Sequence, residues 1–365
     1  MNLLYKAITH TLFAIAVLLL PIYVFAQTSG DQRGLKDYYR DYFPMGVAVT
    51  AKQLADSAQQ NFILTHFNSL TAENAMKMGP IHPKEDLFFW KDADAIVAFA
   101  QKHNLKVRGH NLCWHNQTPK WIFYDEFGKQ VSKEVLLQRL KDHIYAVVGR
   151  YKGQIYAWDV VNEAVSDEPD QLLRNSLWYQ ICGEDFIYKA FQYAHEADPK
   201  AILFYNDYNT ENPDKRQRIY KLLKKMRNKG VPVHAIGLQA HWTFKDPSQE
   251  RLESTLKLFA SLGLKIQITE LDVSIYADGN LQDKTVIAPV SILTPEREQQ
   301  QAEQYSMIFK VFRNYKKCIS GVTFWNLSDK YSWLDNFPVR GRKNYPLLFD
   351  TQLKPKKAYW NVVKF

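Results

Sequence analysis

The sequence contains only three cysteines, Cys113, Cys182 and Cys318, in 365 residues. An odd number at these wide spacings matches no metal-binding motif and permits at most one disulfide. Disulfides are therefore not expected to hold this fold together. Cys113 and Cys318 stand in apolar, strand-like stretches, where a cysteine is commonly a buried hydrophobic residue.

A hydrophobic run long enough to cross a membrane is also missing. The longest candidate, "TLFAIAVLLLPIYVFA" at 11–26, has about 15 apolar residues where a spanning helix needs roughly 20, and Pro21 interrupts it. One cation, Lys6, precedes the run, and Val-Phe-Ala closes it. This pattern predicts that the first 26 residues are a secretory signal peptide cleaved after Ala26, with an uncleaved anchor as the alternative. The mature chain, residues 27–365, is then expected to be secreted or periplasmic, with no membrane contact.

Positive charge is not concentrated where it would suit a nucleic acid. The formal net charge is +9, but the lysines and arginines are scattered apart from "KLLKKMRNK" at 221–229. Such a run is typical of a solvated helix face rather than of a nucleic-acid-binding stripe. No nucleic-acid partner is therefore expected, and the basic balance only weakly favours an acidic polymer as substrate.

The sequence has no Pro/Ser/Gly-rich linker, no low-complexity tract and no second module; it alternates between two kinds of segment. Eight short apolar runs, rich in β-branched and aromatic residues, predict strands. They are "FPMGVAV" (43–49), "FNSLTAE" (67–73), "LKVRGHNLCW" (105–114), "IYAWDVVNE" (155–163), "AILFYNDY" (201–208), "HAIGLQAHW" (234–242), "LKIQITELDV" (264–273) and "ISGVTFWNL" (319–327).

Amphipathic segments separate these runs and predict helices. Eight strand–helix units with nearly continuous apolar strands indicate a parallel sheet covered by helices. At this length the simplest closed form is a (β/α)8 TIM barrel in a single domain. The predicted helices span 92–102, 133–150, 215–229, 247–262, 295–314 and 354–363.

Six of the eight apolar runs change to polar or aromatic residues toward their carboxyl ends. In a (β/α)8 barrel those ends meet at the face where active sites are built. A structural role explains one such residue, but not their concentration at one end of six strands. The residues are Glu73 and Asn74, 110–115, Asn162 and Glu163, 206–209, 239–242 and 270–272.

Glu163 and Glu270 end the predicted fourth and seventh strands and so face each other across the barrel mouth. For a single glutamate a stabilising ion pair is the alternative role, but two suit glycosidic hydrolysis: one protonates the leaving oxygen and the other attacks the anomeric carbon or activates water. Asn162 is placed to donate to a sugar hydroxyl. Asp272 shares its side of the strand with Glu270 and is expected to form a carboxylate–imidazole–carboxylate relay with His241. The relay keeps Glu270 ionised, whereas Glu163, as the acid, needs a raised pKa.

Six sequence blocks together resemble glycoside hydrolase family 10, the endo-β-1,4-xylanases. The resemblance extends from about Leu35 to Phe365, and the blocks follow one another in the family's order. They are "RGHNLCWHNQTP", "WDVVNE", "NDYN", "GLQAHW", "ITELDV" and "FWNLSDKYSWL". The resemblance implies a retaining endo-1,4-β-xylanase that cleaves internal linkages of xylan and xylo-oligosaccharides with no cofactor and no metal, and a monomer is expected.

The resemblance also implies roles for particular residues. Glu163 of "VVNE" matches the general acid/base and Glu270 of "ITELD" the nucleophile, with Asn162, His241 and Asp272 in support. The residues implied to bind substrate are His110, Trp114 and Gln239 around the attacked xylose, Glu73, Asn74 and Lys77 at the next xylose outward, and Trp325 and Trp333 over the sugars.

Metal-dependent hydrolysis is one alternative, because His110, His115 and His241 gather with carboxylates at the strand ends. The first predicted strand, "FPMGVAVT", lacks the His-x-His motif common in TIM-barrel metallohydrolases. Histidines that are neutral or part of a relay therefore explain the pattern better than metal ligands.

Two further alternatives concern substrate and turnover. A β-1,4-glucanase on the same scaffold would accept the exocyclic hydroxymethyl of glucose, which a tight site around Lys77 and Trp325 excludes by clash. A glycan-binding protein on an inactive scaffold would be expected to lack Glu163 or Glu270, and both are present.

Overall fold

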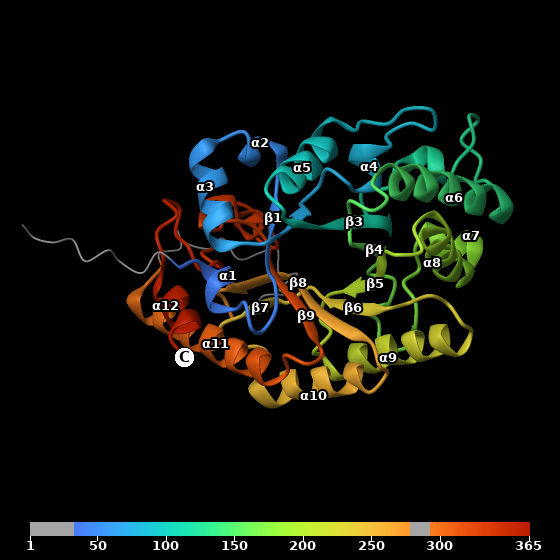
Figure 1. Ribbon diagram of the computed structural model, residues 1–365. Helices are drawn as coiled ribbons and strands as arrows, with labels where there is room; N and C mark the ends of the chain where they lie inside the picture. The colour runs from blue at the N-terminus through green and yellow to red at the C-terminus, as the bar shows by residue number, and fades with distance from the viewer. Residues whose placement is uncertain (1–32, 278–292) are drawn as a thin grey trace, which may run out of the picture. The chain divides into compact units, whose positions relative to one another are not determined.

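Eight parallel strands close into a barrel in the computed structural model, which describes residues 33–277 and 293–365 (Figure 1). The order around the ring is β6-β5-β4-β3-β2-β1-β9-β8, and the pairing of β6 with β8 closes it. The predicted (β/α)8 barrel is thus confirmed, whereas the predicted signal peptide lies outside the described residues. The strands are β1 (Met45–Val49), β2 (Ser69–Ala72), β3 (Lys106–Trp114), β4 (Ala157–Asn162), β5 (Ile202–Asp207), β6 (Ala235–Leu238), β7 (His241–Thr243), β8 (Lys265–Ser274) and β9 (Ile319–Phe324).

The sixth barrel strand differs from its prediction. The sequence predicts one strand over 234–242, but the structure contains two short strands, β6 and β7, both paired with β8. Ala240, between them, has a φ of 63°, in the left-handed region that interrupts a strand. After this break His241 pairs in register with Asp272 of β8. The irregularity therefore brings the imidazole to the polar end of β8.

Helices surround the ring of strands (Figure 1). Capping residues explain where two of the long ones begin: Ser132 Oγ accepts a hydrogen bond from Val135 N, and Thr294 Oγ1 accepts one from Arg297 N. The helices are α1 (Leu35–Tyr38), α2 (Ala51–Leu54), α3 (Ser57–His66), α4 (Met78–Ile81), α5 (Lys91–Lys102), α6 (Lys133–Arg150), α7 (Leu177–Cys182), α8 (Asp185–Ala197), α9 (Pro213–Asn228), α10 (Gln249–Ala260), α11 (Pro295–Asn314) and α12 (Lys357–Val363).

The long helices agree closely with the sequence pattern. α6 and α11 have the predicted bounds, and α5, α9 and α10 differ from prediction by at most two residues at either end. α8 has no counterpart among the predicted helices, although its buried residues Phe186, Ala190 and Ala194 repeat at helical spacing. In the described ranges, no helix combines the length and the apolar character needed to span a bilayer.

Candidate active site

Glu163 and Glu270 both lie at the carboxyl ends of barrel strands. Glu163 directly follows β4, and its φ of 56° turns the chain out of the strand. Glu270 lies in the second half of β8. Their side chains are almost completely enclosed, since the two residues are 8% and 4% exposed. The structure thus places both glutamates at the same face of the barrel.

Three side chains donate hydrogen bonds to the Glu163 carboxyl group. Trp114 Nε1 lies 2.8 Å from Oε2, while Asn162 Nδ2 and Gln239 Nε2 lie 3.1 and 2.9 Å from Oε1. Trp114 ends β3, Asn162 ends β4, and Gln239 follows β6. Donors from the ends of three different strands therefore hold the carboxyl group in one orientation.

Glu270 is held by an amide on one side and an imidazole on the other. Asn206 Nδ2 donates to Oε1 at 2.8 Å, and His241 Nε2 lies 3.2 Å from Oε2. His241 Nδ1 in turn lies 3.0 Å from Asp272 Oδ2. The imidazole thus stands between two carboxylates, in the arrangement that the sequence predicts for Asp272, His241 and Glu270.

The two glutamates have opposite pKa shifts. Burial raises the pKa of Glu163, and the negative charges of Asp207 and Glu270 raise it further. Burial would also raise the pKa of Glu270, but the hydrogen bond from His241 and nearby positive charge lower it to about 2. Burial opposes charge on His241 as well, yet Asp272 and Glu270 raise the pKa of the imidazole to about 10. At neutral pH the site therefore holds an ionised Glu270 beside an imidazolium, as a nucleophile requires.

Asn206 connects the two glutamates, a role that the sequence did not predict. Its Nδ2 lies 2.8 Å from both Glu270 Oε1 and Asn162 Oδ1, and its Oδ1 accepts a hydrogen bond from Thr269 Oγ1 at 2.7 Å. Asn162 donates to Glu163, so a short chain of amides joins one carboxyl group to the other. The sequence signals for Asn206 were its position at the polar end of a strand and its place in the block "NDYN".

His110 is oriented by two charged residues inside the barrel. Its Nδ1 lies 2.7 Å from Asp159 Oδ2, and Arg108 forms an ion pair with the same oxygen. Arg108 and Asp159 are fully buried, and Arg108 Nη2 also donates to Thr269 O at 2.8 Å. Neither was predicted as a site residue. The available signal was a charged residue in the middle of an otherwise apolar strand, which is costly unless it is paired.

Glu73, Asn74 and Lys77 follow β2 and border the same site. Lys77 Nζ donates to Asn74 Oδ1 at 2.9 Å and lies 5.0 and 5.9 Å from the ring centres of Trp114 and Trp325. Burial lowers the pKa of Lys77, and the surrounding glutamates oppose that shift. The residues predicted for the outward sugar are thus connected to those around the glutamates.

The indole rings of Trp325 and Trp333 lie beside two histidines of the site. The ring of Trp325 lies 5.3 Å from that of His110, and the ring of Trp333 lies 4.9 Å from that of His241. Trp333 Nε1 also donates to Asp272 Oδ2 at 2.9 Å. All of the residues predicted for the site therefore belong to one connected group at one end of the barrel.

None of the three cysteines is among the residues predicted for the site. The three cysteines are free in the structure. Cys113 precedes Trp114 but is fully buried, and burial raises the pKa of its thiol well above the usual range. Among residues 33–277 and 293–365, no cluster of three or more His, Cys, Asp or Glu side chains is arranged to hold a metal ion.

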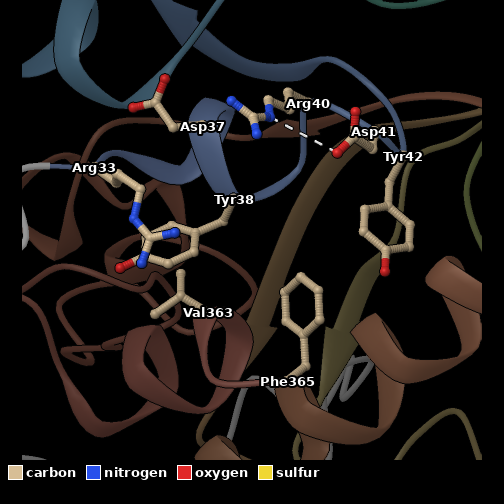
Figure 2. Close-up of a pocket in the computed structure, with 8 residues that line it drawn as sticks. All are labelled: Arg33, Asp37, Tyr38, Arg40, Asp41, Tyr42, Val363 and Phe365. Atoms are coloured by element: carbon tan, nitrogen blue, oxygen red, sulfur yellow. Dashed lines mark ion pairs between the residues drawn. The ribbon is translucent and has the colours of Figure 1, made fainter.

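A surface hollow of about 340 Å³ lies elsewhere, between α1 and the end of the chain (Figure 2). Tyr42 in its wall precedes the first residue of β1, so the hollow lies toward the amino ends of the strands. It contains none of the predicted site residues, and (β/α)8 enzymes build their active sites at the opposite end. Its lining is Arg33, Asp37, Tyr38, Arg40, Asp41, Tyr42, Val363 and Phe365.

The carboxyl end of the barrel therefore holds two enclosed glutamates, one with a raised and one with a lowered pKa. Aromatic rings and amides surround them. This is the arrangement by which glycoside hydrolases cleave the bond between two sugars.

The chain belongs to glycosyl hydrolase family 10, whose family model matches residues 34–365. It is 49% identical over 360 residues to the β-1,4-xylanase of Dictyoglomus thermophilum, and the matched region covers 97% of this chain and 99% of that protein. An endo-1,4-β-xylanase of Geobacillus stearothermophilus is 48% identical, over 90% of this chain and 97% of the relative. Among solved structures, xylanase XynB from Paenibacillus barcinonensis superimposes with a TM-score of 0.86 at 46% identity, covering 92% of this chain and 99% of that one.

Proposed function

We propose that this enzyme is an endo-1,4-β-xylanase that hydrolyses internal β-1,4-xylosidic bonds of xylan with net retention. The observation that carries the proposal is the pair of enclosed glutamates at one end of the barrel, one with a raised and one with a lowered pKa, because a retaining hydrolase needs one carboxylic acid and one carboxylate. The names of the family 10 relatives support xylan as the substrate.

In the first step Glu270 Oε attacks the anomeric carbon while Glu163 donates its proton to the glycosidic oxygen. The bond to the leaving sugar breaks, and a covalent xylosyl–Glu270 ester forms. Glu163, now a carboxylate, accepts a proton from water as the water attacks the same carbon, and Glu270 leaves as a carboxylate. The Trp114 and Gln239 donors keep Glu163 on its side of the bond, and His241 stabilises the charge of Glu270 before and after the reaction.

Substrate binding extends outward from the glutamates. Asn162 and His110 are expected to contact hydroxyls of the attacked xylose, and Glu73, Asn74 and Lys77 those of the next sugar. Trp325 and Trp333 supply flat apolar faces for the CH-rich sides of pyranose rings. Because Trp325 is packed against His110, it cannot easily move aside for the exocyclic hydroxymethyl of glucose.

The test is reducing-sugar release from xylan and from a soluble cellulose derivative, with wild type and Glu270→Gln measured side by side. The expected result is release from xylan, little from cellulose, and none from the variant. Release from cellulose instead would keep the mechanism and overturn the substrate. A folded wild type that releases nothing from either polymer would overturn the enzyme proposal.

We also propose that the chain is exported as a monomer after cleavage behind Ala26. The support for cleavage and export is the sequence alone: a single cation followed by a short apolar run that ends in Val-Phe-Ala. Amino-terminal sequencing of the exported protein should begin at Gln27, and light scattering should give the mass of one chain. An intact amino terminus held in the membrane would contradict cleavage.

A further inference from the structure

Asn326 occupies an unusual backbone position next to the site. It directly follows Trp325, is 3% exposed, and has a φ of 128°. Backbone in this region favours glycine, because a Cβ is strained there. An asparagine at such a position needs favourable side-chain contacts to offset the strain.

Three hydrogen bonds fix the direction in which the Asn326 amide faces. The backbone N–H of Leu327 donates to its Oδ1 at 3.0 Å, and Gln53 Nε2 donates to the same oxygen at 2.8 Å. A backbone N–H can only donate, so the oxygen must lie on this side. The Nδ2 group therefore faces Glu73 and donates to its Oε2 at 3.1 Å.

Gln53 is itself held in place by the start of α2. Its Oε1 accepts hydrogen bonds from Thr50 N at 2.8 Å and Thr50 Oγ1 at 3.2 Å, as part of a capping box. This leaves the Nε2 group of Gln53 to face Asn326. A continuous set of directed hydrogen bonds thus runs from the cap of α2 through two amides to the Glu73 carboxylate.

We propose that Asn326 is a positioning residue for sugar binding: it orients Glu73 so that one carboxylate oxygen is occupied and the other accepts a hydroxyl of the xylose two positions from the cleaved bond. The inference rests on the proposed function. Asn326 engages only Oε2, and an ionised carboxylate accepts hydrogen bonds at both oxygens. Burial raises the pKa of Glu73, while the charge of Lys77 and the hydrogen bonds from Asn326 and Asn74 oppose that shift and favour the ionised form.

The test compares two chromogenic substrates that differ by one sugar. An aryl β-xylobioside places a sugar beside Glu73, whereas an aryl β-xyloside reaches only the attacked position. Asn326→Gly removes the amide but suits the backbone, so the variant is expected to fold with an unchanged or higher melting temperature. Its kcat/KM should fall about tenfold on the xylobioside, as expected for a lost hydrogen bond to a charged group, and less than twofold on the xyloside.

Two companion measurements separate positioning from a general structural effect. Asn326→Asp keeps the oxygen that accepts hydrogen bonds but places a second carboxylate beside Glu73. Its kcat/KM on the xylobioside should fall further than that of Asn326→Gly. The loss should become smaller at lower pH, where the pair of carboxylates takes up a proton. In a Glu73→Ala background, Asn326→Gly should have no further effect.

The outcomes separate this inference from the proposed function. A wild type that hydrolyses neither aryl glycoside would overturn the proposed function. An active wild type, combined with equal losses on both substrates or with an unaffected xylobioside, would overturn the role of Asn326 and leave the xylanase proposal standing.

Discussion

Glu163 and Glu270 show how the same kind of side chain acquires opposite pKa shifts at one end of the barrel. Both are buried, which favours the neutral form of each. Glu270 contacts His241, whose positive charge is stabilised by Asp272. The Glu270 carboxylate therefore stays ionised despite its burial. Glu163 has neutral donors and negative neighbours instead, so its proton is retained to higher pH. The different pKa values come from the neighbours, because the amount of burial is similar.

Glu163→Gln keeps the size of the side chain and removes its proton. We expect kcat/KM to fall by about 10²–10⁴-fold on aryl β-xylobiosides with poor leaving groups, the usual contribution of a general acid. Substrates with strongly acidic phenols should lose far less, because their departure needs little proton transfer. The measurement is kcat/KM across a series of leaving groups, with Glu270→Gln as the control that loses activity on all of them. Uniform losses across the series for Glu163→Gln would contradict the acid assignment.

At the level of elements, strand β6 is shaped to make room for the amides that link the glutamates. A Cβ on Gly237 would lie 2.1 Å from Asn206 Oδ1 and 2.8 Å from Thr269 Cγ2. Gly237 pairs with Asn206 of β5 on one side and with Gln267 of β8 on the other. The missing side chain in β6 therefore lets Asn206 reach Glu270 from the neighbouring strand.

Gly237→Ala should accordingly disturb both stability and catalysis. Overpacking of a filled interior costs about 1–3 kcal/mol, and displacement of Asn206 should lower kcat/KM because Glu270 loses a hydrogen bond. Gly149→Ala in α6 is the matched control: its Cβ would meet no atom within 4 Å, so the helix should gain about 1 kcal/mol with unchanged activity. Thermal unfolding and xylan hydrolysis measure the two effects. A Gly237→Ala variant with wild-type kcat/KM would show that the Asn206 contact is dispensable.

At the level of the whole molecule, one buried and two half-buried histidines link stability to pH. Burial lowers the pKa of His66 and of His115 to about 4, and that of His143 to about 3, from an ordinary value of 6.5. His143 is fully buried and its Nδ1 lies 3.1 Å from His82 Nδ1. Below pH 6.5 the unfolded chain binds protons that the folded chain does not. The stability from each of these histidines is therefore present above pH 6.5 and is lost as the pH falls toward the folded pKa.

His143→Gln isolates one such contribution. Between pH 6.5 and 4 the wild type should lose about 3 kcal/mol of unfolding free energy through this residue, which the variant does not lose. The stability difference between the two proteins should thus shrink as the pH falls, because every other titrating group is common to both. Denaturant unfolding at pH 7, 5.5 and 4 provides the measurement. A difference that is constant with pH would mean that His143 does not titrate between the folded and unfolded states.

The barrel and most of its site were predictable because they follow from local patterns. The helices α6 and α11 have caps and amphipathic spacing that are visible in the chain, and polar residues at strand ends identified Glu163 and Glu270. The division of the sixth strand at Ala240 was not predictable, since a left-handed alanine has no compositional signal. Arg108 and Asp159 were also missed, because a charge inside an apolar run shows its partner only after folding.

The sequence by itself determined the repeat of strands and helices, the family, and which residues gather at the carboxyl ends of the strands. These depend on periodicity and on motifs whose members are close in the chain. Only the tertiary structure decided that Asn206 joins the two glutamates, that Asn326 faces Glu73, and that Asp207 is among the neighbours that raise the pKa of Glu163. Hydrogen-bond direction and burial depend on residues from different strands meeting within about 3 Å, and sequence spacing does not specify such distances.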